Sequence, residues 1–236
     1  MTTLPSRGGA LARAAAHFAS GALRDDLARR VAFRTESQRG DRAAQQRAYL
    51  SQEMAPALAA MGFSTRGVDN PGKPDCPFLI AARDEDAAAP TVLIYGHGDV
   101  VLGMDGRWRE GRDPWRLDVA GERWYGRGTA DNKGQHSINL AALRQVFDER
   151  GGELGFNCKV LIETGEEAGS PGLREVARAQ SAALAADVLI ASDGPRLTAE
   201  RPTVFLGSRG AVNFDLSLDL REGAHHSGNW GGLLAN

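Results

Sequence analysis

Residues 91–99 read TVLIYGHGD, and this stretch decides the fold because a run of branched apolar residues ends abruptly in glycine, histidine and aspartate. Two later stretches have the same design, since residues 159–167 read KVLIETGEE and residues 187–193 read DVLIASD. Short continuous apolar runs are typical of strands buried on both faces of a parallel sheet. Functional groups in such sheets gather at the carboxyl ends of the strands. The sequence therefore predicts a parallel sheet with polar side chains along one edge.

Helical segments alternate with these strands. Apolar residues recur three and four positions apart over 9–33 and 43–61, and further helices are predicted over 133–150 and 171–184. Another short strand is predicted over 78–82. Strands that alternate with helices form a sheet covered by helices on both faces. The predicted fold class is therefore α/β, with a mostly parallel sheet flanked by helices.

A change of pattern further along the chain predicts a second domain. Residues 204–220 alternate apolar and polar side chains over their second half, as an antiparallel strand with one solvent-exposed face does. We therefore expect residues 1–205 to form the main domain and residues 206–236 to begin a smaller α+β domain.

Composition limits the classes of partner and compartment. The chain of 236 residues has a formal net charge of -2 at pH 7, so we expect neither nucleic acid nor another polyanion as a partner. No window reaches the roughly 18 apolar residues of a membrane span. Cys76 and Cys158 lie in apolar runs, as reduced and buried thiols do. These features predict a cytoplasmic protein without a membrane anchor.

The strand ends and one helix start bring together acidic groups and a histidine. These residues are His97, Asp99, Asp131, Glu166, Glu167 and Asp193. So many carboxylates at one edge repel one another unless a cation neutralises them. Imidazole and carboxylate ligands without thiolate favour Zn²⁺, with Mn²⁺ or Co²⁺ as alternatives. A pair of metal ions bridged by a carboxylate is common in hydrolytic sites, and Asp131 is the candidate bridge.

Four segments carry these residues: YGHGDVV at 95–101, GRGTADNKG at 126–134, ETGEEAGSPGL at 163–173 and ASDGPR at 191–196. In order and spacing they resemble the metal-site motifs of the M20 metallopeptidase and amidohydrolase family. That family includes carnosinase-like dipeptidases, aminoacylases, succinyl-diaminopimelate desuccinylases and glutamate carboxypeptidases. The resemblance implies a zinc-peptidase-like catalytic domain over 1–205, incomplete in this chain, followed by the start of a lid and dimerisation domain.

The resemblance also implies a role for each metal-site residue. His97 would bind the first metal, with Asp99 orienting its imidazole, a common task for a carboxylate behind a ligating histidine. Asp131 would bridge both metals, and Asp193 would complete the ligands of the first. Glu167 would bind the second metal.

Three further residues take roles by the same resemblance. Glu166 would be the catalytic base that takes a proton from the attacking water and delivers it to the leaving amine. His226, in HSGNWGG, matches a histidine that is lent across a dimer interface to stabilise the oxyanion. Arg209, in GSRG, matches a position near the substrate and would hold a substrate carboxylate. A homodimer is therefore expected for the full-length form.

The function implied is metal-dependent hydrolysis of peptide or N-acyl amide bonds in small substrates through a dinuclear zinc centre. A dipeptidase is the first expectation and an N-acyl-amino-acid deacylase the second. The family's second metal also takes a distal histidine from beyond the lid, so the sequence resembles the N-terminal half of a longer enzyme. The alternative is a fragment that binds metal or a partner chain without turnover. His136 is interpreted as a polar-face or satisfied core histidine.

Overall fold

The computed structural model describes residues 6–194, 196–198, 200–207, 210, 212 and 214–218. The chain divides into two compact units, Met1–Asp193 and Gly194–Asn236. In the described residues of the second unit we find an isolated bridge between Thr198 and Arg201 and no strand. The antiparallel strand predicted for 204–220 and the domain boundary beside it therefore stay predictions.

A five-stranded sheet forms the centre of the first unit, in the order β1-β2-β6-β3-β7. Its strands are β1 (Ser64–Val68), β2 (Phe78–Arg83), β3 (Thr91–His97), β6 (Asn157–Glu163) and β7 (Val188–Ala191). β3 lies between β6 and β7 and is parallel to both. β2 is antiparallel to β6, and β1 is antiparallel to β2. The α/β fold is confirmed, and the parallel strands are those that precede the predicted site residues.

The sheet is mixed because the connection before β2 is too short for a crossover. The loop 69–77 joins β1 to β2, whereas parallel neighbours need a connection of about a dozen residues or more. Helix α5 (Lys133–Glu149) lies between β3 and β6 in the sequence, and α6 (Leu173–Ala179) with α7 (Ser181–Leu184) lies between β6 and β7. These longer connections allow β3, β6 and β7 to run in the same direction.

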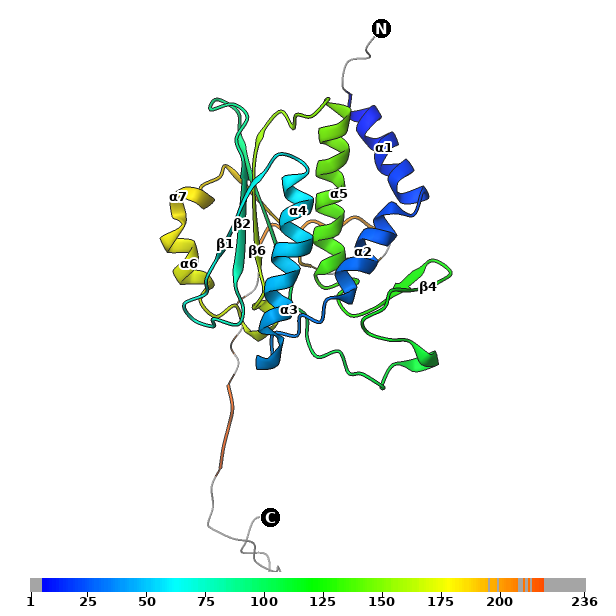
Figure 1. The fold of residues 1–236 in the computed structure, drawn as a ribbon, viewed down its shortest axis with the longest axis vertical. Helices are drawn as coiled ribbons and strands as arrows, with labels where there is room; N and C mark the ends of the chain where they lie inside the picture. Colours follow the sequence, from blue (N-terminus) through cyan, green and yellow to red (C-terminus); the bar gives the residue numbers. More distant parts are fainter. Residues whose placement is uncertain are drawn as a thin grey trace, which may run out of the picture. The chain divides into compact units, whose positions relative to one another are not determined.

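Helices cover both faces of the sheet (Figure 1). Besides α5, one layer holds α1 (Arg7–Ala19), α2 (Ala22–Ala32), α3 (Ala43–Ala48), a π-helical segment (Tyr49–Met54) and α4 (Ala55–Ala59). Helices α6 and α7 lie on the opposite face. The single helix predicted over 9–33 is wrong, because Gly21 adopts a left-handed conformation with φ of 84° and separates α1 from α2.

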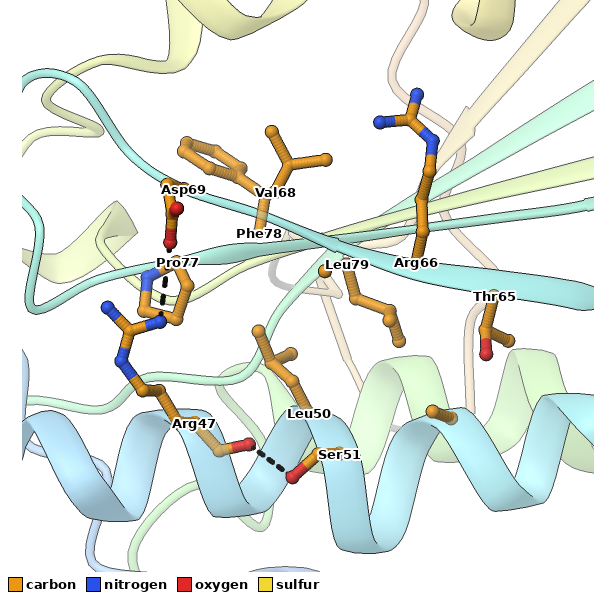
Figure 2. A pocket seen from close by; sticks show the side chains of 12 residues that line it. Arg47, Leu50, Ser51, Thr65, Arg66, Val68, Asp69, Pro77, Phe78 and Leu79 are labelled. Atoms are coloured by element: carbon orange, nitrogen blue, oxygen red, sulfur yellow. Dashed lines mark hydrogen bonds and ion pairs between the residues drawn. The ribbon is translucent and has the colours of Figure 1, made fainter.

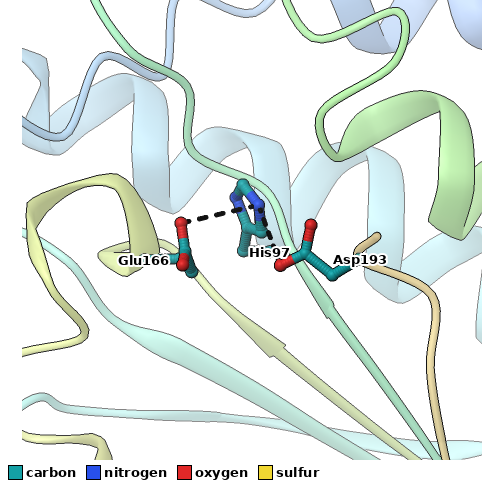
Figure 3. A group of neighbouring side chains, drawn as sticks. All are labelled: His97, Glu166 and Asp193. Atoms are coloured by element: carbon teal, nitrogen blue, oxygen red, sulfur yellow. Dashed lines mark ion pairs between the residues drawn. The ribbon is translucent and has the colours of Figure 1, made fainter. Parts of the chain in front are cut away.

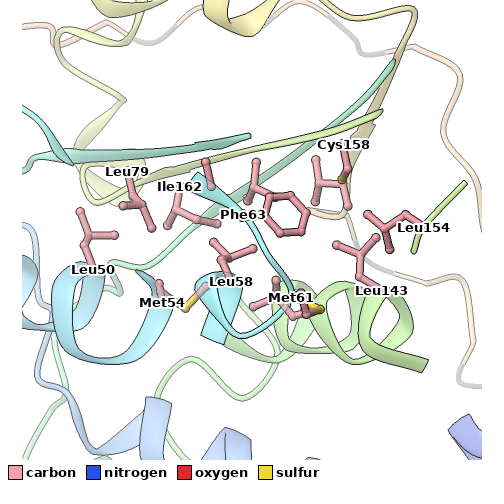
Figure 4. Close-up of a cluster of buried hydrophobic side chains, with 14 of the residues drawn as sticks. Leu50, Met54, Leu58, Met61, Phe63, Leu79, Leu143, Leu154, Cys158 and Ile162 are labelled. Carbon is pink, nitrogen blue, oxygen red and sulfur yellow. The ribbon is translucent and has the colours of Figure 1, made fainter. Parts of the chain in front are cut away.

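Side chains that alternate along β6 pack into two different cores. Val160 and Ile162 belong to the larger core, together with Leu58 of α4 (Figure 4). Leu161 packs with Val176 of α6 on the other face. Successive side chains of a strand point to opposite faces, which explains the division. β6 is therefore buried on both faces, as its continuous apolar run predicts.

β7 departs from that expectation. It pairs with β3 on one side and, within the described residues, with no strand on the other. Val188, Leu189 and Ile190 are accordingly 49%, 63% and 42% exposed. The same kind of apolar run is thus buried in the middle of the sheet and exposed at its edge. A continuous apolar run predicts the strand, but its place in the sheet decides its burial.

Two further features concern compartment and membrane. Cys76 and Cys158 are free and buried, as the sequence predicts. Over the part of the chain that the structure describes, no helix has the length and apolar character needed to cross a bilayer. A small hairpin of β4 (Asp118–Ala120) and β5 (Arg123–Tyr125) lies apart from the main sheet.

Replacing Leu58 by alanine tests the larger core. Leu58 is fully buried, so Leu58→Ala is expected to lower the free energy of unfolding by about 2–5 kcal/mol through lost apolar contacts and a residual cavity. Leu11 is 57% exposed on α1, so the matched control Leu11→Ala is expected to change it by no more than about 0.5 kcal/mol. Urea titration followed by circular dichroism measures both. Equal destabilisation by the two variants would contradict this packing.

Candidate metal centre

The three parallel strands deliver polar residues to one edge of the sheet. His97 is the last residue of β3 and pairs in register with Glu163, the last residue of β6. Asp193 follows β7, Glu166 begins a short helical turn after β6, and Asp131 lies just before α5. Figure 3 shows the side chains of His97, Glu166 and Asp193 directed toward one another. The strand ends predicted to meet therefore do meet.

The imidazole of His97 is the centre of this group and is fully buried. Its Nε2 atom lies 2.9 Å from Asp131 Oδ1, 3.7 Å from Asp193 Oδ2 and 3.8 Å from Glu166 Oε2. Ligand atoms about 2.0–2.2 Å from a tetrahedral zinc ion are about 3.3–3.6 Å apart. The carboxylate oxygens around Nε2 of His97 lie within a few tenths of an ångström of these separations, and one imidazole nitrogen with several carboxylate oxygens fits the donor chemistry of a zinc site.

Asp99 contacts the imidazole of His97 from the other side. Its buried carboxylate oxygen Oδ1 lies 3.4 Å from Nδ1 of His97, and its backbone oxygen lies 3.1 Å from the same nitrogen. The two carboxylate oxygens also accept hydrogen bonds from the backbone N–H groups of Glu166 (3.1 Å) and Glu167 (3.0 Å). One carboxylate thus fixes both the histidine that ends β3 and the turn that carries two glutamates after β6.

The charges of this group shift the pKa values of its members. Burial alone would lower the pKa of His97, but the neighbouring carboxylates of Asp193 and Asp99 outweigh burial and raise the pKa to about 11. The neighbouring imidazole of His97 in turn lowers the pKa of Asp193. These surroundings favour a positive charge beside Nε2 of His97, which either a proton or a metal ion provides.

The two glutamates after β6 shift in the opposite direction. Burial and the nearby carboxylate of Asp131 raise the pKa of Glu167 to about 7. Burial also raises the pKa of Glu166, although the neighbouring His97 acts to lower it. Carboxylates that crowd one another in this way are stabilised in their charged form by a bound cation. The electrostatics and the donor geometry therefore both favour a bound metal cation.

The structure brings most of the predicted residues together. Those that share the contacts described above are His97, Asp99, Asp131, Glu166 and Asp193. Glu167 joins them through its backbone N–H and through the charge of Asp131. Ligand atoms of His97, Glu166 and Asp193 lie within 4.8 Å of one another, so the division of roles between the two glutamates stays a proposal. His226 and Arg209 lie outside the described residues.

Glu163 is a further buried carboxylate, which the sequence analysis did not single out. Its Oε1 atom accepts hydrogen bonds from the hydroxyl groups of Tyr95 (2.6 Å) and Ser170 (2.9 Å). Burial raises its pKa. Glu163 thereby ties the end of β6 to the loop that follows the two glutamates. The sequence feature that could have indicated Glu163 is a charged residue at the end of an apolar run.

Asn132 and His136 are a second pair that the analysis did not place at the site. Both are buried, and they lie four residues apart at the start of α5, the spacing of neighbours on one helix face. Nδ1 of His136 is 3.1 Å from Oδ1 of Asn132. The interpretation of His136 as a satisfied core histidine is therefore confirmed, while its contact with Asn132 connects it to the group around His97.

A separate cavity of about 360 Å³ lies between β1, β2 and the helical run that includes α3 (Figure 2). Two arginines line it, but both are already paired. Arg47 contacts Asp69 at 3.4 Å and the backbone oxygen of Pro74 at 3.0 Å, and Arg66 donates to Gln180. None of the lining residues belongs to the group around His97. This cavity is therefore separate from the group around His97, which is the candidate metal-binding group found among the described residues.

Comparisons of sequence identify related proteins. Residues 93–223 match peptidase family M20/M25/M40. The chain is 38% identical over 165 residues to the cysteinylglycine-S-conjugate dipeptidase of Corynebacterium striatum, and the alignment covers 69% of this chain and 35% of that protein. It is 33% identical over 169 residues to the β-Ala-His dipeptidase of Mus musculus, and this alignment covers 70% of this chain and 34% of that protein.

A solved structure shares the fold. Human carnosine dipeptidase 1 matches with a TM-score of 0.66 and 26% sequence identity, over 78% of this chain and 40% of that chain. The chain spans about a third of the length of the curated relatives named above. The family match over residues 93–223 contains the ends of the three parallel strands and the candidate metal centre.

Asp99→Asn tests the contacts behind His97. Asparagine has the same size, but its NH₂ group would replace one of the two oxygens that accept hydrogen bonds from the backbone N–H groups of Glu166 and Glu167. Two donors would then face each other. We expect the affinity for zinc to fall about 10- to 100-fold, because His97 and the following turn lose their common anchor. Competition with a chromophoric chelator measures the affinity. Asp69→Asn is the control, because the side chain of Asp69 is 92% exposed, and equal affinities of the two variants would contradict the role of Asp99.

Proposed function

The chain belongs to peptidase family M20/M25/M40, and on this premise we propose that the group around His97 binds zinc and that the complete protein hydrolyses dipeptides. The observation that carries the proposal is the approach of three carboxylates to Nε2 of His97, at 2.9 to 3.8 Å. The two relatives named above are dipeptidases, which supports dipeptides as the substrate class.

The chain's own residues would hold the metal as follows. His97, Asp131 and Asp193 would bind the first zinc ion, and Asp131 with Glu167 would bind a second. The donor set of imidazole nitrogen and carboxylate oxygen suits zinc, with Mn²⁺ or Co²⁺ as alternatives. When bound, the metal supplies Lewis-acid polarisation of the scissile carbonyl and acidifies the attacking water. Asp99 would orient the imidazole, because its carboxylate lies beside Nδ1 of His97 while Nε2 faces the other carboxylates.

Glu166 is the proposed general base. Its Oε2 atom lies 3.8 Å from Nε2 of His97, and its side chain is 38% exposed, so water and substrate can reach it beside the metal ligands. The carboxylate takes a proton from water while the water oxygen bonds to the carbonyl carbon. It then delivers that proton to the amide nitrogen as the C–N bond breaks. One water is consumed, and a carboxylic acid and an amine are released.

Other parts of the function stay predictions for the complete protein. His226 is proposed to stabilise the oxyanion from the partner subunit of a homodimer, and Arg209 is proposed to bind a substrate carboxylate. Hydrolysis of N-acyl amino acids is the alternative reaction, because it also breaks an amide bond and needs the same proposed metal and base. A cytoplasmic location is likewise an expectation from the sequence.

Glu166→Gln tests the proposed reaction. Glutamine keeps the size of the side chain but does not accept a proton, so kcat for dipeptide hydrolysis is expected to fall about 10²- to 10⁴-fold. The affinity for zinc is expected to stay near that of the wild type, because the proposed ligands are unchanged. Release of free amino acid from Cys-Gly and from β-Ala-His measures the rate. Glu122→Gln is the control, since Glu122 is exposed in the turn between β4 and β5.

Two results would change the proposal. Release of amine from N-acyl amino acids but not from dipeptides would favour the deacylase alternative. A zinc-loaded wild-type protein that cleaves neither class would overturn the hydrolase proposal and favour metal binding without turnover.

A further inference from the structure

The side chain of Asn132 joins two strand ends behind the metal centre. Its Oδ1 atom accepts a hydrogen bond from the backbone N–H of His97 (3.2 Å). Its Nδ2 atom donates to the backbone oxygen of Ser192 (2.6 Å) and to Oδ1 of Asp193 (3.2 Å), and Oε1 of Gln135 lies 2.6 Å from the same nitrogen. This fully buried amide therefore connects the end of β3 to the end of β7, and each end carries a proposed metal ligand.

Two backbone groups fix the orientation of the Asn132 amide. The N–H of His97 can only donate a hydrogen bond, and the carbonyl oxygen of Ser192 can only accept one. The amide oxygen of Asn132 must therefore face His97, and its NH₂ group must face Ser192. The reversed amide would set donor against donor at β3 and acceptor against acceptor at β7, which leaves buried polar groups unpaired.

The orientation of this amide determines where His136 carries its proton. Nδ1 of His136 lies 3.1 Å from the oxygen of Asn132, so Nδ1 must be the donor. Burial, with the positive charge of Arg30, holds the pKa of His136 well below its usual value, so the ring is neutral and Nε2 is the acceptor. The hydroxyl of Tyr49 lies 2.5 Å from Nε2 and donates to it. Tyr49 thus donates a hydrogen bond to His136, and His136 donates one to Asn132.

Two glycines beside His97 make room for these side chains. A β-carbon at Gly96 would lie 2.9 Å from Cβ of His136 and 3.0 Å from Oδ1 of Asn132. A β-carbon at Gly98 would overlap the ring of Tyr49. Contacts this close are tighter than those of an ordinary packed side chain, so the network is built directly against the strand that carries His97.

His136 is not itself a metal ligand in this arrangement. Tyr49 engages one of its ring nitrogens and Asn132 engages the other, and the ring is 1% exposed. The hydrogen bonds of His136 therefore reach the proposed metal ligands through the amide of Asn132.

We propose that Tyr49 and His136 are positioning residues, which hold the amide of Asn132 in the orientation that keeps His97 and Asp193 together as ligands of one metal ion. This inference rests on the proposed metal centre. Loss of the Tyr49 hydroxyl allows the proton of His136 to move from Nδ1 to Nε2. The unprotonated Nδ1 then faces the oxygen of Asn132. Two acceptors then face each other, and the amide loses its fixed orientation relative to Asp193.

Substitutions along the network test the inference through metal affinity. Tyr49→Phe removes only a hydroxyl, and His136→Leu removes the donor to Asn132. Each is expected to weaken binding about tenfold, the lower end of the effect of losing a direct partner of a ligand, because the change acts through Asn132. The purified chain is titrated with Co²⁺, followed by its visible absorption, and the Co²⁺ is then displaced by Zn²⁺. Because both changes act through one amide, the double variant is expected to bind no more weakly than His136→Leu.

Two controls separate positioning from general stability. His136→Gln is expected to recover most of the affinity, because its amide can accept from Tyr49 and donate to Asn132. Tyr125→Phe removes a hydroxyl from β5, outside this network, and is expected to leave the affinity unchanged. Wild-type affinity in folded Tyr49→Phe and His136→Leu proteins would overturn the inference while leaving the metal centre in place.

A measurement without metal distinguishes this inference from the proposed function. Long-range ¹H–¹⁵N NMR spectra of the metal-free wild-type protein report the tautomer of His136. The expected result is a neutral ring with its proton on Nδ1, and a smaller share of that tautomer in Tyr49→Phe. A proton on Nε2, or a doubly protonated ring, would overturn the inference whatever the metal affinity. A wild-type chain that binds neither Co²⁺ nor Zn²⁺ would instead overturn the metal centre, and with it this role.

Discussion

The buried carboxylate of Asp99 is the interaction on which the candidate site depends. Its oxygens face Nδ1 of His97 and the backbone N–H groups of the two glutamates after β6. On the other side of the histidine, Asn132 connects the backbone of His97 to Asp193. The ring is therefore tied to the turn after β6 while the backbone is tied to the end of β7. Only Nε2 is left to face the carboxylates, which is the arrangement a metal ligand requires.

The strands that support this geometry could be predicted from the sequence, but some elements could not. β3 and β6 are continuous apolar runs, and a polar residue after such a run lies at the carboxyl end of a parallel strand. β1 reads STRGV and is a strand because it pairs with β2, which its composition alone does not indicate. Gly21 divides the first predicted helix, although glycine is tolerated both within helices and at their ends. The exposure of β7 likewise depends on its position at the edge.

The same distinction applies to the site. His97 and Asp193 were predictable because each directly follows an apolar run, and their meeting then follows from the parallel sheet. The contact of Tyr49 with His136 was not predictable, because 87 residues separate them in the sequence. Hydrogen bonds between residues so far apart leave no local sequence pattern. His136 could be interpreted as a buried and satisfied histidine from its place in a helix. What it supports depends on its partners, which only the fold brings together.

The zinc content of the purified chain, measured by elemental analysis after zinc loading and dialysis, tests the central claim most directly. We expect about one to two zinc ions per wild-type chain. We expect their loss in both His97→Ala and Asp131→Ala, because the first ligand and the bridge are removed. We expect far-ultraviolet circular dichroism to stay unchanged, because the backbone pairing of β3 does not involve either side chain. A wild-type chain without zinc, or a His97→Ala variant with the wild-type amount, would contradict the account.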